Sequence, residues 1–278
     1  MMTYETLNIR RDGRVLYLDF NNPPLNLMTM QMVGELFDLA GSLAFDPDTA
    51  VVVFSSNNPE FFIAHFDLHD LIRVVSGDPA VPQSHYDDIN AVQALTTTWQ
   101  TLPQVTIAVV DGICRGVGLE FLLATDMRFA SPESKFGLPE TSGGILPGGG
   151  GTTRLAMQIG PARALEVLLS ARDFTGEEAA AYGILNRTVA RSDLKAYTDT
   201  LAQSIAERPP AAIAAVAQVI KDAYDSMVDA QFAGFASENS GLRTLSAAPG
   251  VKEALQMLAG LQDPDHERDL PSTIAAAR

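Results

Sequence analysis

The chain has 278 residues, 46% of them hydrophobic, and is therefore long enough to bury the core of one large domain. Its formal net charge of −15 argues against binding to nucleic acid or to an anionic membrane surface, because both depend on Lys and Arg side chains. A single cysteine, Cys114, excludes an internal disulfide, and the N-terminus lacks the basic and apolar regions of a signal peptide, so we expect a cytoplasmic protein.

The first two-thirds of the chain alternates strand-like and helix-like segments, which is typical of an α/β fold. Residues 51–54 and 105–110 are continuous apolar runs of the kind that strands covered on both faces need. The predicted strands are residues 14–20, 49–55, 105–110, 127–130, 135–136 and 185–189. The predicted helices are residues 29–44, 68–75, 87–101, 119–124, 153–159, 161–170 and 175–182, and residues 77–84 predict a loop.

After about residue 190 the strand signals disappear. Residues 193–207, 210–235 and 251–261 have helical patterns, whereas the tail, residues 263–278, is polar with two prolines and is expected to fray. We therefore expect an α/β core over residues 1–195 and an all-helical oligomerisation region over residues 196–278.

Four segments with chemically useful residues follow predicted strands, where open α/β sheets place their sites. They are residues 62–68, 111–120, 136–140 and the glycine-rich run 143–151. The turn at Gly116 and Gly118 exposes backbone N–H groups at a helix N-terminus, where negative charge is welcome. Phe121 stands where a dinucleotide fingerprint needs glycine, and His65 and His69 lack a third ligand, so neither a dinucleotide nor a metal is expected.

Two carboxylates stand out, and each has a simple structural explanation. Glu120 interrupts an apolar stretch at a helix start, where the helix dipole favours an acidic residue. Glu140 follows a proline in a loop, where a carboxylate is usually solvated. Neither residue on its own identifies a function.

The order and spacing of the motifs are more informative. The chain has Asn-Pro-Pro-Leu-Asn at 22–26, Phe-Ile-Ala-His-Phe-Asp-Leu at 62–68, a glycine turn ending in Glu120, Phe-Gly-Leu-Pro-Glu at 136–140 and a glycine-rich run over 144–155. Over nearly its whole length the chain resembles the crotonase (enoyl-CoA hydratase/isomerase) superfamily. The resemblance implies an α/β fold made of a spiral of ββα units, with a C-terminal all-helical trimerisation region.

The resemblance also implies a reaction: hydration of a 2-enoyl-CoA thioester by a homotrimer or homohexamer, with coenzyme A as part of the substrate and no separate cofactor or metal. Glu120 and Glu140, 20 positions apart, match the two glutamates of the hydratases and would form the acid–base pair. The N–H groups of Phe66 and Val117 would form the oxyanion hole. The backbone of Gly148 would complete the water site, and the substrate would be contacted by Ala64, His65, Asp67, Leu68 and Gly116.

Three departures from the family pattern keep other functions open. His65 and Val117 replace glycines, and Glu60 stands where a Lys or Arg often meets the phosphates of coenzyme A. The alternatives are double-bond isomerisation or acyl-CoA hydrolysis on the same scaffold, C–C hydrolysis of a β-diketone without coenzyme A, and a catalytically idle paralogue.

Overall fold

The computed structural model describes residues 3–78 and 89–276, without the side chains of 221–229. A six-stranded sheet has the order β1-β2-β3-β5-β7-β10, in which only β1 and β2 pair antiparallel. Its strands are β1 (Leu7–Asp12), β2 (Val15–Phe20), β3 (Val51–Ser56), β5 (Val105–Val110), β7 (Met127–Ala130) and β10 (Arg187–Thr188).

A second, four-stranded sheet has the order β4-β6-β8-β9. Its strands are β4 (Phe61–Ile63), β6 (Ile113–Arg115), β8 (Lys135–Gly137) and β9 (Phe174–Thr175). Each of β3, β5 and β7 in the large sheet is followed by β4, β6 or β8 in the small one and then by a helix. This repetition of strand, strand and helix is the expected spiral of ββα units.

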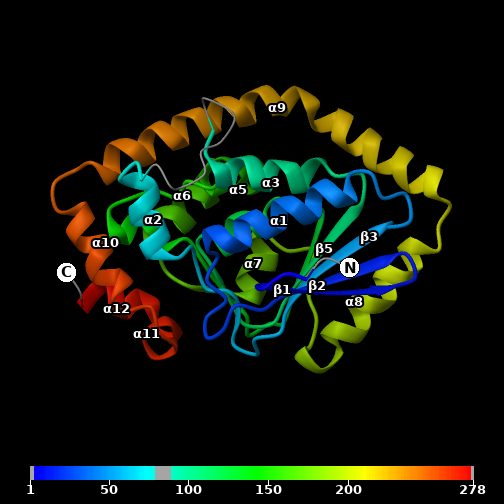
Figure 1. Ribbon diagram of the computed structural model, residues 1–278, viewed down its shortest axis with the longest axis horizontal. Coiled ribbons are helices and arrows are strands. Elements are labelled where there is room, and N and C mark those ends of the chain that lie inside the picture. The colour runs from blue at the N-terminus through cyan, green and yellow to red at the C-terminus, as the bar shows by residue number, and fades with distance from the viewer. Residues whose placement is uncertain (1–2, 79–88, 277–278) are drawn as a thin grey trace.

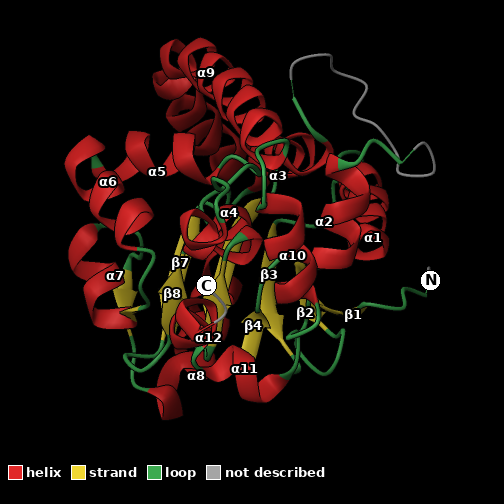
Figure 2. Cartoon of the chain, turned by 90° about the vertical axis from the view of Figure 1, so that its left-hand side faces the viewer, coloured by secondary structure: helices red, strands yellow, loops and turns green. Residues whose placement is uncertain are grey.

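Helices enclose both sheets (Figures 1 and 2). In the first half of the chain these are α1 (Met30–Leu43), α2 (Leu68–Val75), α3 (Ala91–Thr101), α4 (Val117–Leu122) and the 3₁₀ turn η1 (Pro139–Gly143). They are followed by α5 (Gly151–Ile159), α6 (Pro161–Ser170), α7 (Gly176–Tyr182) and α8 (Arg191–Ala206). The chain ends with α9 (Pro210–Ser246), α10 (Val251–Ala259), α11 (Pro264–Arg268) and α12 (Leu270–Ala276).

The large sheet is buried on both faces, which explains why its strands are continuous apolar runs. Alternate residues of β2 and β3, such as Leu18 and Phe54, point into the core that also contains α1 and α3. The residues between them, such as Tyr17 and Val53, pack with α8 on the opposite face.

Most helices and the strands β2, β3, β5 and β7 follow the sequence predictions closely, but the six-residue strand β1 was not predicted. The strands predicted at 105–110 and 127–130 have the expected bounds, and Thr175 caps α7 with Glu178 in a capping box. By contrast, β4 and β6 were not predicted, because three residues are too few to show a period, and the last predicted strand is reduced to the two residues of β10. Part of the predicted loop at 77–84 and the start of the helix predicted at 87–101 lie outside the described residues.

The C-terminal third differs most from expectation. The expected division at residue 195 falls within α8, which packs on β2, β3, β5 and β7. The prediction of a frayed tail is wrong for the described part of it: residues 264–276 form α11 and α12, with Glu267, Leu270 and Ile274 buried. In Figure 1 the long α9 runs along one side of the molecule, and α10 lies beside α2. Among the described helices, none is both long and apolar enough to cross a membrane.

Candidate active site

Three of the four predicted segments meet because three parallel strands end at the same edge. In the small sheet, β4, β6 and β8 run parallel, so their carboxyl ends lie side by side. Residues 64–67 follow β4, Gly116 follows β6, and Glu140 comes three positions after the end of β8. Residues 64 and 140, which are 76 positions apart in sequence, therefore belong to one site.

Hydrogen bonds from the Asn-Pro-Pro segment, residues 22–28, position the loop after β4. Met28 donates its N–H to the carbonyl of His65 (2.9 Å) and accepts the N–H of Asp67 (3.0 Å). Nδ2 of Asn26 donates hydrogen bonds to the backbone carbonyls of Phe61 (3.2 Å) and Phe62 (3.3 Å). The motif at 22–28 thus sets the position of this loop.

Phe66 and Val117 line the cavity at this edge, and each carries a backbone N–H group. Phe66 lies in the loop after β4, and Val117 is the first residue of α4, where a helix leaves its N–H groups without internal partners. Neither N–H donates a hydrogen bond to another described residue. Both backbone donors are therefore left without a protein acceptor in the part of the chain that the structure describes.

Glu120 projects from the first turn of α4 and is only 3% exposed. Its Oε1 accepts the N–H groups of Gly149 (2.7 Å) and Gly151 (2.8 Å). Burial raises the pKa of Glu120 well above its ordinary value, and the nearby carboxylates of Glu140 and Glu238 raise it further, against the effect of the two N–H donors.

Glu140 lies across the cavity in η1, and its Oε2 has no hydrogen-bond partner among the described residues. Burial raises the pKa of Glu140 to about 7, although its own N–H and the neighbouring His65 oppose the increase. Two buried carboxylates that raise each other's cost of ionisation favour a state with one proton between them, which places an acid and a base in one site.

The raised pKa of Glu140 predicts a gain in stability when its charge is removed. Below pH 4.5 the carboxyl is protonated in the folded and the unfolded chain, whereas between pH 4.5 and about 7 only the folded chain holds the proton, so stability falls as the pH rises. At pH 8 we expect the free energy of unfolding of Glu140→Gln to exceed that of wild type by on the order of 2 to 3 kcal/mol. In urea titrations the variant should then unfold at a higher urea concentration at pH 8, with little difference at pH 4.5. A variant that is less stable than wild type at pH 8 would contradict the burial of an ionised carboxyl.

The two glutamates and the two N–H groups line one cavity of about 610 Å³. Its remaining wall is largely apolar and comes from distant parts of the chain, including Leu71 of α2, Leu242 of α9, Leu258 of α10 and Ile274 of α12. The helices that follow residue 210 therefore enclose the site as well as extending the fold.

The other predicted site residues divide into two groups. His65, Leu68 and Gly148 line the cavity, and the carbonyl of Gly148 accepts Nδ2 of Asn90 at 2.6 Å. The remaining three lie behind the cavity wall: Ala64 packs in a small apolar cluster, Asp67 caps α2, and Gly116 (φ 50°) caps α4. A Cβ on Gly116 would lie 2.8 Å from Oε1 of Glu140, so a side chain there would displace the carboxylate.

The sequence analysis missed Glu238, a third buried carboxylate near the site. It projects from α9 and accepts the N–H of Gly150 (2.5 Å) and both N–H and Oγ1 of Thr153 (3.1 and 3.0 Å). Glu120 and Glu238 thus bind neighbouring N–H groups at the start of α5. No signal of its burial is visible in the sequence, because its neighbours in the run Ser-Glu-Asn-Ser, residues 237–240, are polar.

Glu60, whose charge was expected to weaken the binding of coenzyme A phosphates, forms an ion pair with Arg268. Its exposed carboxylate accepts Nε of Arg268 at 2.7 Å and Nη2 at 3.2 Å. The tail that was predicted to fray therefore supplies the cation that partly neutralises Glu60.

Comparison with known proteins gives a consistent result. The profile of the Enoyl-CoA hydratase/isomerase family matches residues 10–268. A Mycobacterium tuberculosis protein assigned as the enoyl-CoA hydratase EchA17 is 33% identical over 217 residues, which cover 77% of this chain and 80% of the relative. A carnitinyl-CoA dehydratase of Salmonella heidelberg is 28% identical over 95% of this chain and 97% of its own. A crystal structure assigned as an enoyl-CoA hydratase of Streptomyces avermitilis is 35% identical, covers 99% of both chains and superposes with a TM-score of 0.85.

Proposed function

The chain belongs to the enoyl-CoA hydratase/isomerase family, and on this premise we propose that it adds water to the double bond of a 2-enoyl-CoA thioester. The observation that carries the proposal is the pair Glu120 and Glu140, which face one cavity together with two unpaired backbone N–H groups. An isomerase needs one proton-transferring group, whereas addition of water needs one group to take a proton and another to give one.

The proposed reaction follows from this geometry. The thioester oxygen accepts the N–H groups of Phe66 and Val117, which stabilise the enolate-like state by about 3 kcal/mol per donor. Glu120, with Oε1 held by two N–H groups, takes a proton from water as the hydroxyl adds to Cβ. Glu140 gives its proton to Cα, so the pair holds one proton before and after the reaction.

Two further observations support a coenzyme A thioester as the substrate. The ion pair with Arg268 partly cancels the charge of Glu60, which was one argument against coenzyme A besides the absence of a basic pair in residues 258–264. The Salmonella relative is named a carnitinyl-CoA dehydratase, and loss of water is the reverse of the proposed addition, using the same groups. The proposed reaction needs no cofactor besides the coenzyme A of the substrate.

Incubation with a short 2-enoyl-CoA tests the proposal directly. We expect the conjugated enoyl absorbance to disappear and mass spectrometry to show a 3-hydroxyacyl-CoA. Formation of the 3-enoyl isomer would identify an isomerase, release of free coenzyme A thiol would identify a hydrolase, and no reaction together with no coenzyme A binding would favour the β-diketone hydrolase or the idle paralogue.

We further propose that the protein is a homotrimer or homohexamer assembled through its C-terminal helices. In the first part of α9, Ile213 packs on the core, but Val216, Val219 and Ile220 are 62%, 67% and 56% exposed. An isolated chain would leave this surface in water. We expect light scattering to give three or six times the chain mass of 29.8 kDa, and Val219→Asp to lower it. A stable monomer at micromolar concentration would contradict this assembly.

A further inference from the structure

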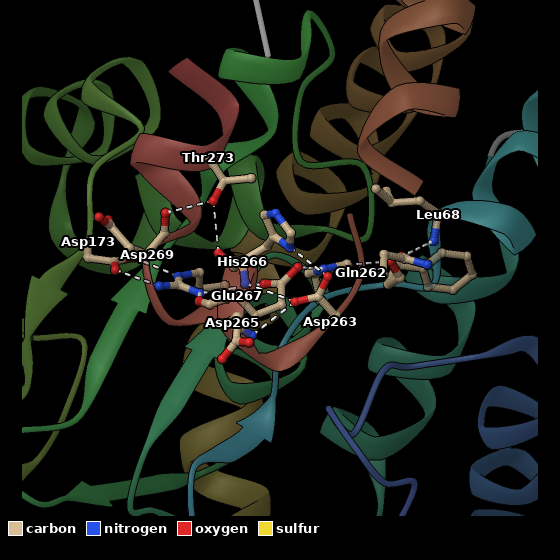
Figure 3. Close-up of polar contacts among 12 residues, drawn as sticks. Leu68, Asp173, Gln262, Asp263, Asp265, His266, Glu267, Asp269 and Thr273 are labelled. Atoms are coloured by element: carbon tan, nitrogen blue, oxygen red, sulfur yellow. Dashed lines mark hydrogen bonds and ion pairs between the residues drawn. The ribbon is translucent and has the colours of Figure 1, made fainter. Parts of the chain in front are cut away.

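The C-terminal segment contacts the loop that carries the Phe66 N–H. Glu267 of α11 is 1% exposed, and its Oε1 lies 2.7 Å from Nε2 of His65. A second contact joins Oε1 of Gln262 to the N–H of Leu68, at 2.7 Å. Figure 3 shows these contacts around Glu267. Phe66 therefore lies between two residues that are each held by the C-terminal segment.

The hydrogen bonds of His65 determine its charge. Nδ1 lies 2.7 Å from the carbonyl oxygen of Phe66, which can only accept, so Nδ1 carries a proton. Nε2 faces the carboxylate of Glu267, and a proton there as well makes the ring an imidazolium. Burial lowers the pKa of His65, but the charge and hydrogen bond of Glu267 more than compensate and raise it.

Arg115 and Asp173 complete a buried network of alternating charges. Arg115, wholly buried in β6, donates to the two carboxylate oxygens of Asp173 at 2.7 and 2.6 Å. Its Nη1 donates to the backbone carbonyl of Glu267 at 2.6 Å and lies 3.7 Å from Oε2 of the same residue. With His65 and Arg115 positive and Glu267 and Asp173 negative, the four groups have no net charge, and removal of one member leaves a buried charge uncompensated.

We propose that Glu267 is a positioning residue, which holds the Phe66 N–H in place through its ion pair with His65. The inference rests on the proposed function, because it assigns the Phe66 N–H to the oxyanion hole. Such a donor must be placed within a few tenths of an ångström to stabilise a developing charge. The imidazolium also keeps a positive charge beside the site. His65 thus replaces the flexibility of the usual glycine with a charged contact to the C-terminal segment.

The pH dependence of this contact has a definite sign. The groups that act on His65 are Glu267 of α11, Arg115 of β6 and Glu140 of η1. Because the pKa of His65 is raised, the ion pair is intact below the ordinary His pKa of 6.5 and is lost as the pH rises through the higher pKa of the folded protein. We therefore expect the deprotonation of His65 to contribute to the alkaline limb of the kcat profile, together with the loss of the Glu140 proton.

Glu267→Gln keeps the shape of the side chain and removes its charge. We expect kcat for hydration to fall at least about 10-fold, with KM changed less than about 3-fold, because an oxyanion donor acts mainly in the transition state. The alkaline limb should move to lower pH, since burial then lowers the pKa of His65. The matched control is Asp265→Asn on the same helix, whose side chain is 90% exposed, and it should change neither quantity.

Nitrogen-15 NMR of the histidine rings gives a measurement that needs no substrate. The chain has four histidines, and His65→Gln identifies the signals of His65. At pH 7 we expect an imidazolium in wild type and in Asp265→Asn, and a neutral ring in Glu267→Gln. A neutral His65 in wild type, or a Glu267→Gln variant with wild-type kcat and pH profile, would overturn the proposal. If the NMR result holds but no enoyl-CoA is hydrated, the ion pair stands and the proposed reaction is wrong.

Discussion

We expect Glu120→Gln and Glu140→Gln each to reduce the hydration of a 2-enoyl-CoA at least about a hundredfold, the usual effect of removing an acid–base group. Each substitution keeps the size of the side chain but removes its ability to exchange a proton. Because both residues act in the same step, we expect the double variant to lose little more than the slower single variant. Stopped-flow or steady-state measurement of enoyl loss, at saturating substrate, tests kcat directly.

Glu35→Gln is the matched control for this pair. Glu35 is also a buried carboxylate, 7% exposed, but it accepts the N–H groups of Glu5 and Thr6 at 2.7 and 3.0 Å, away from the cavity. We expect its substitution to destabilise the fold by about 1 to 3 kcal/mol and to leave kcat unchanged. Hydration at the wild-type rate by both Glu120→Gln and Glu140→Gln would show that the acid–base assignment is wrong.

Gly118→Ala is expected to have the second largest effect, although it adds only one methyl group. A Cβ at this position would lie 2.6 Å from the carbonyl oxygen and 2.9 Å from the Cβ of Ile63, at the end of β4. These atoms cannot turn aside as a long side chain can, so α4 must move away from β4. That movement separates the Val117 N–H from the loop carrying the Phe66 N–H, and a misplacement of about 1 Å can cost about a hundredfold in rate.

The expected result for Gly118→Ala is a fall in kcat of about a hundredfold and a loss of about 1 to 3 kcal/mol of stability, the usual cost of overpacking. Gly34→Ala in α1 is the control, because its Cβ would meet no atom within 4 Å. It should leave kcat unchanged and stabilise the fold by about 0.5 to 1 kcal/mol, since alanine is the better helix former. An active Gly118→Ala with wild-type stability would mean that α4 and β4 are not in contact as described.

Some features could be predicted from the sequence because they depend on neighbouring residues. The strands β3 and β5 are apolar over most of their length because both faces of the large sheet are covered, and this pattern is visible in any window of six residues. Thr175 and Glu178 form their capping box within four residues. The 20-position spacing of Glu120 and Glu140 could be interpreted only through its resemblance to a family pattern.

Other features could not be predicted because their partners lie far away in the chain. The tail has the local signal of a helix start, Asp263 followed by Pro264, which the sequence analysis overlooked, but its polar residues gave no reason to expect burial. Glu267 is buried because its partner is His65, 202 positions away. Glu238 of α9 likewise finds its partners at the start of α5.

By itself, the sequence determined the central strands of the large sheet and most of the helices around it, because burial on two faces, helical periods and caps are all local patterns. The edge strand β1, whose side chains are mostly exposed, did not show such a pattern. The tertiary structure decided which of the acidic residues act together. Glu140 and Glu238 raise the pKa of Glu120 only because a parallel sheet brings the ends of β6 and β8 together and α9 packs against α5. Charge interactions depend on distance and burial, and neither is fixed until the chain has folded.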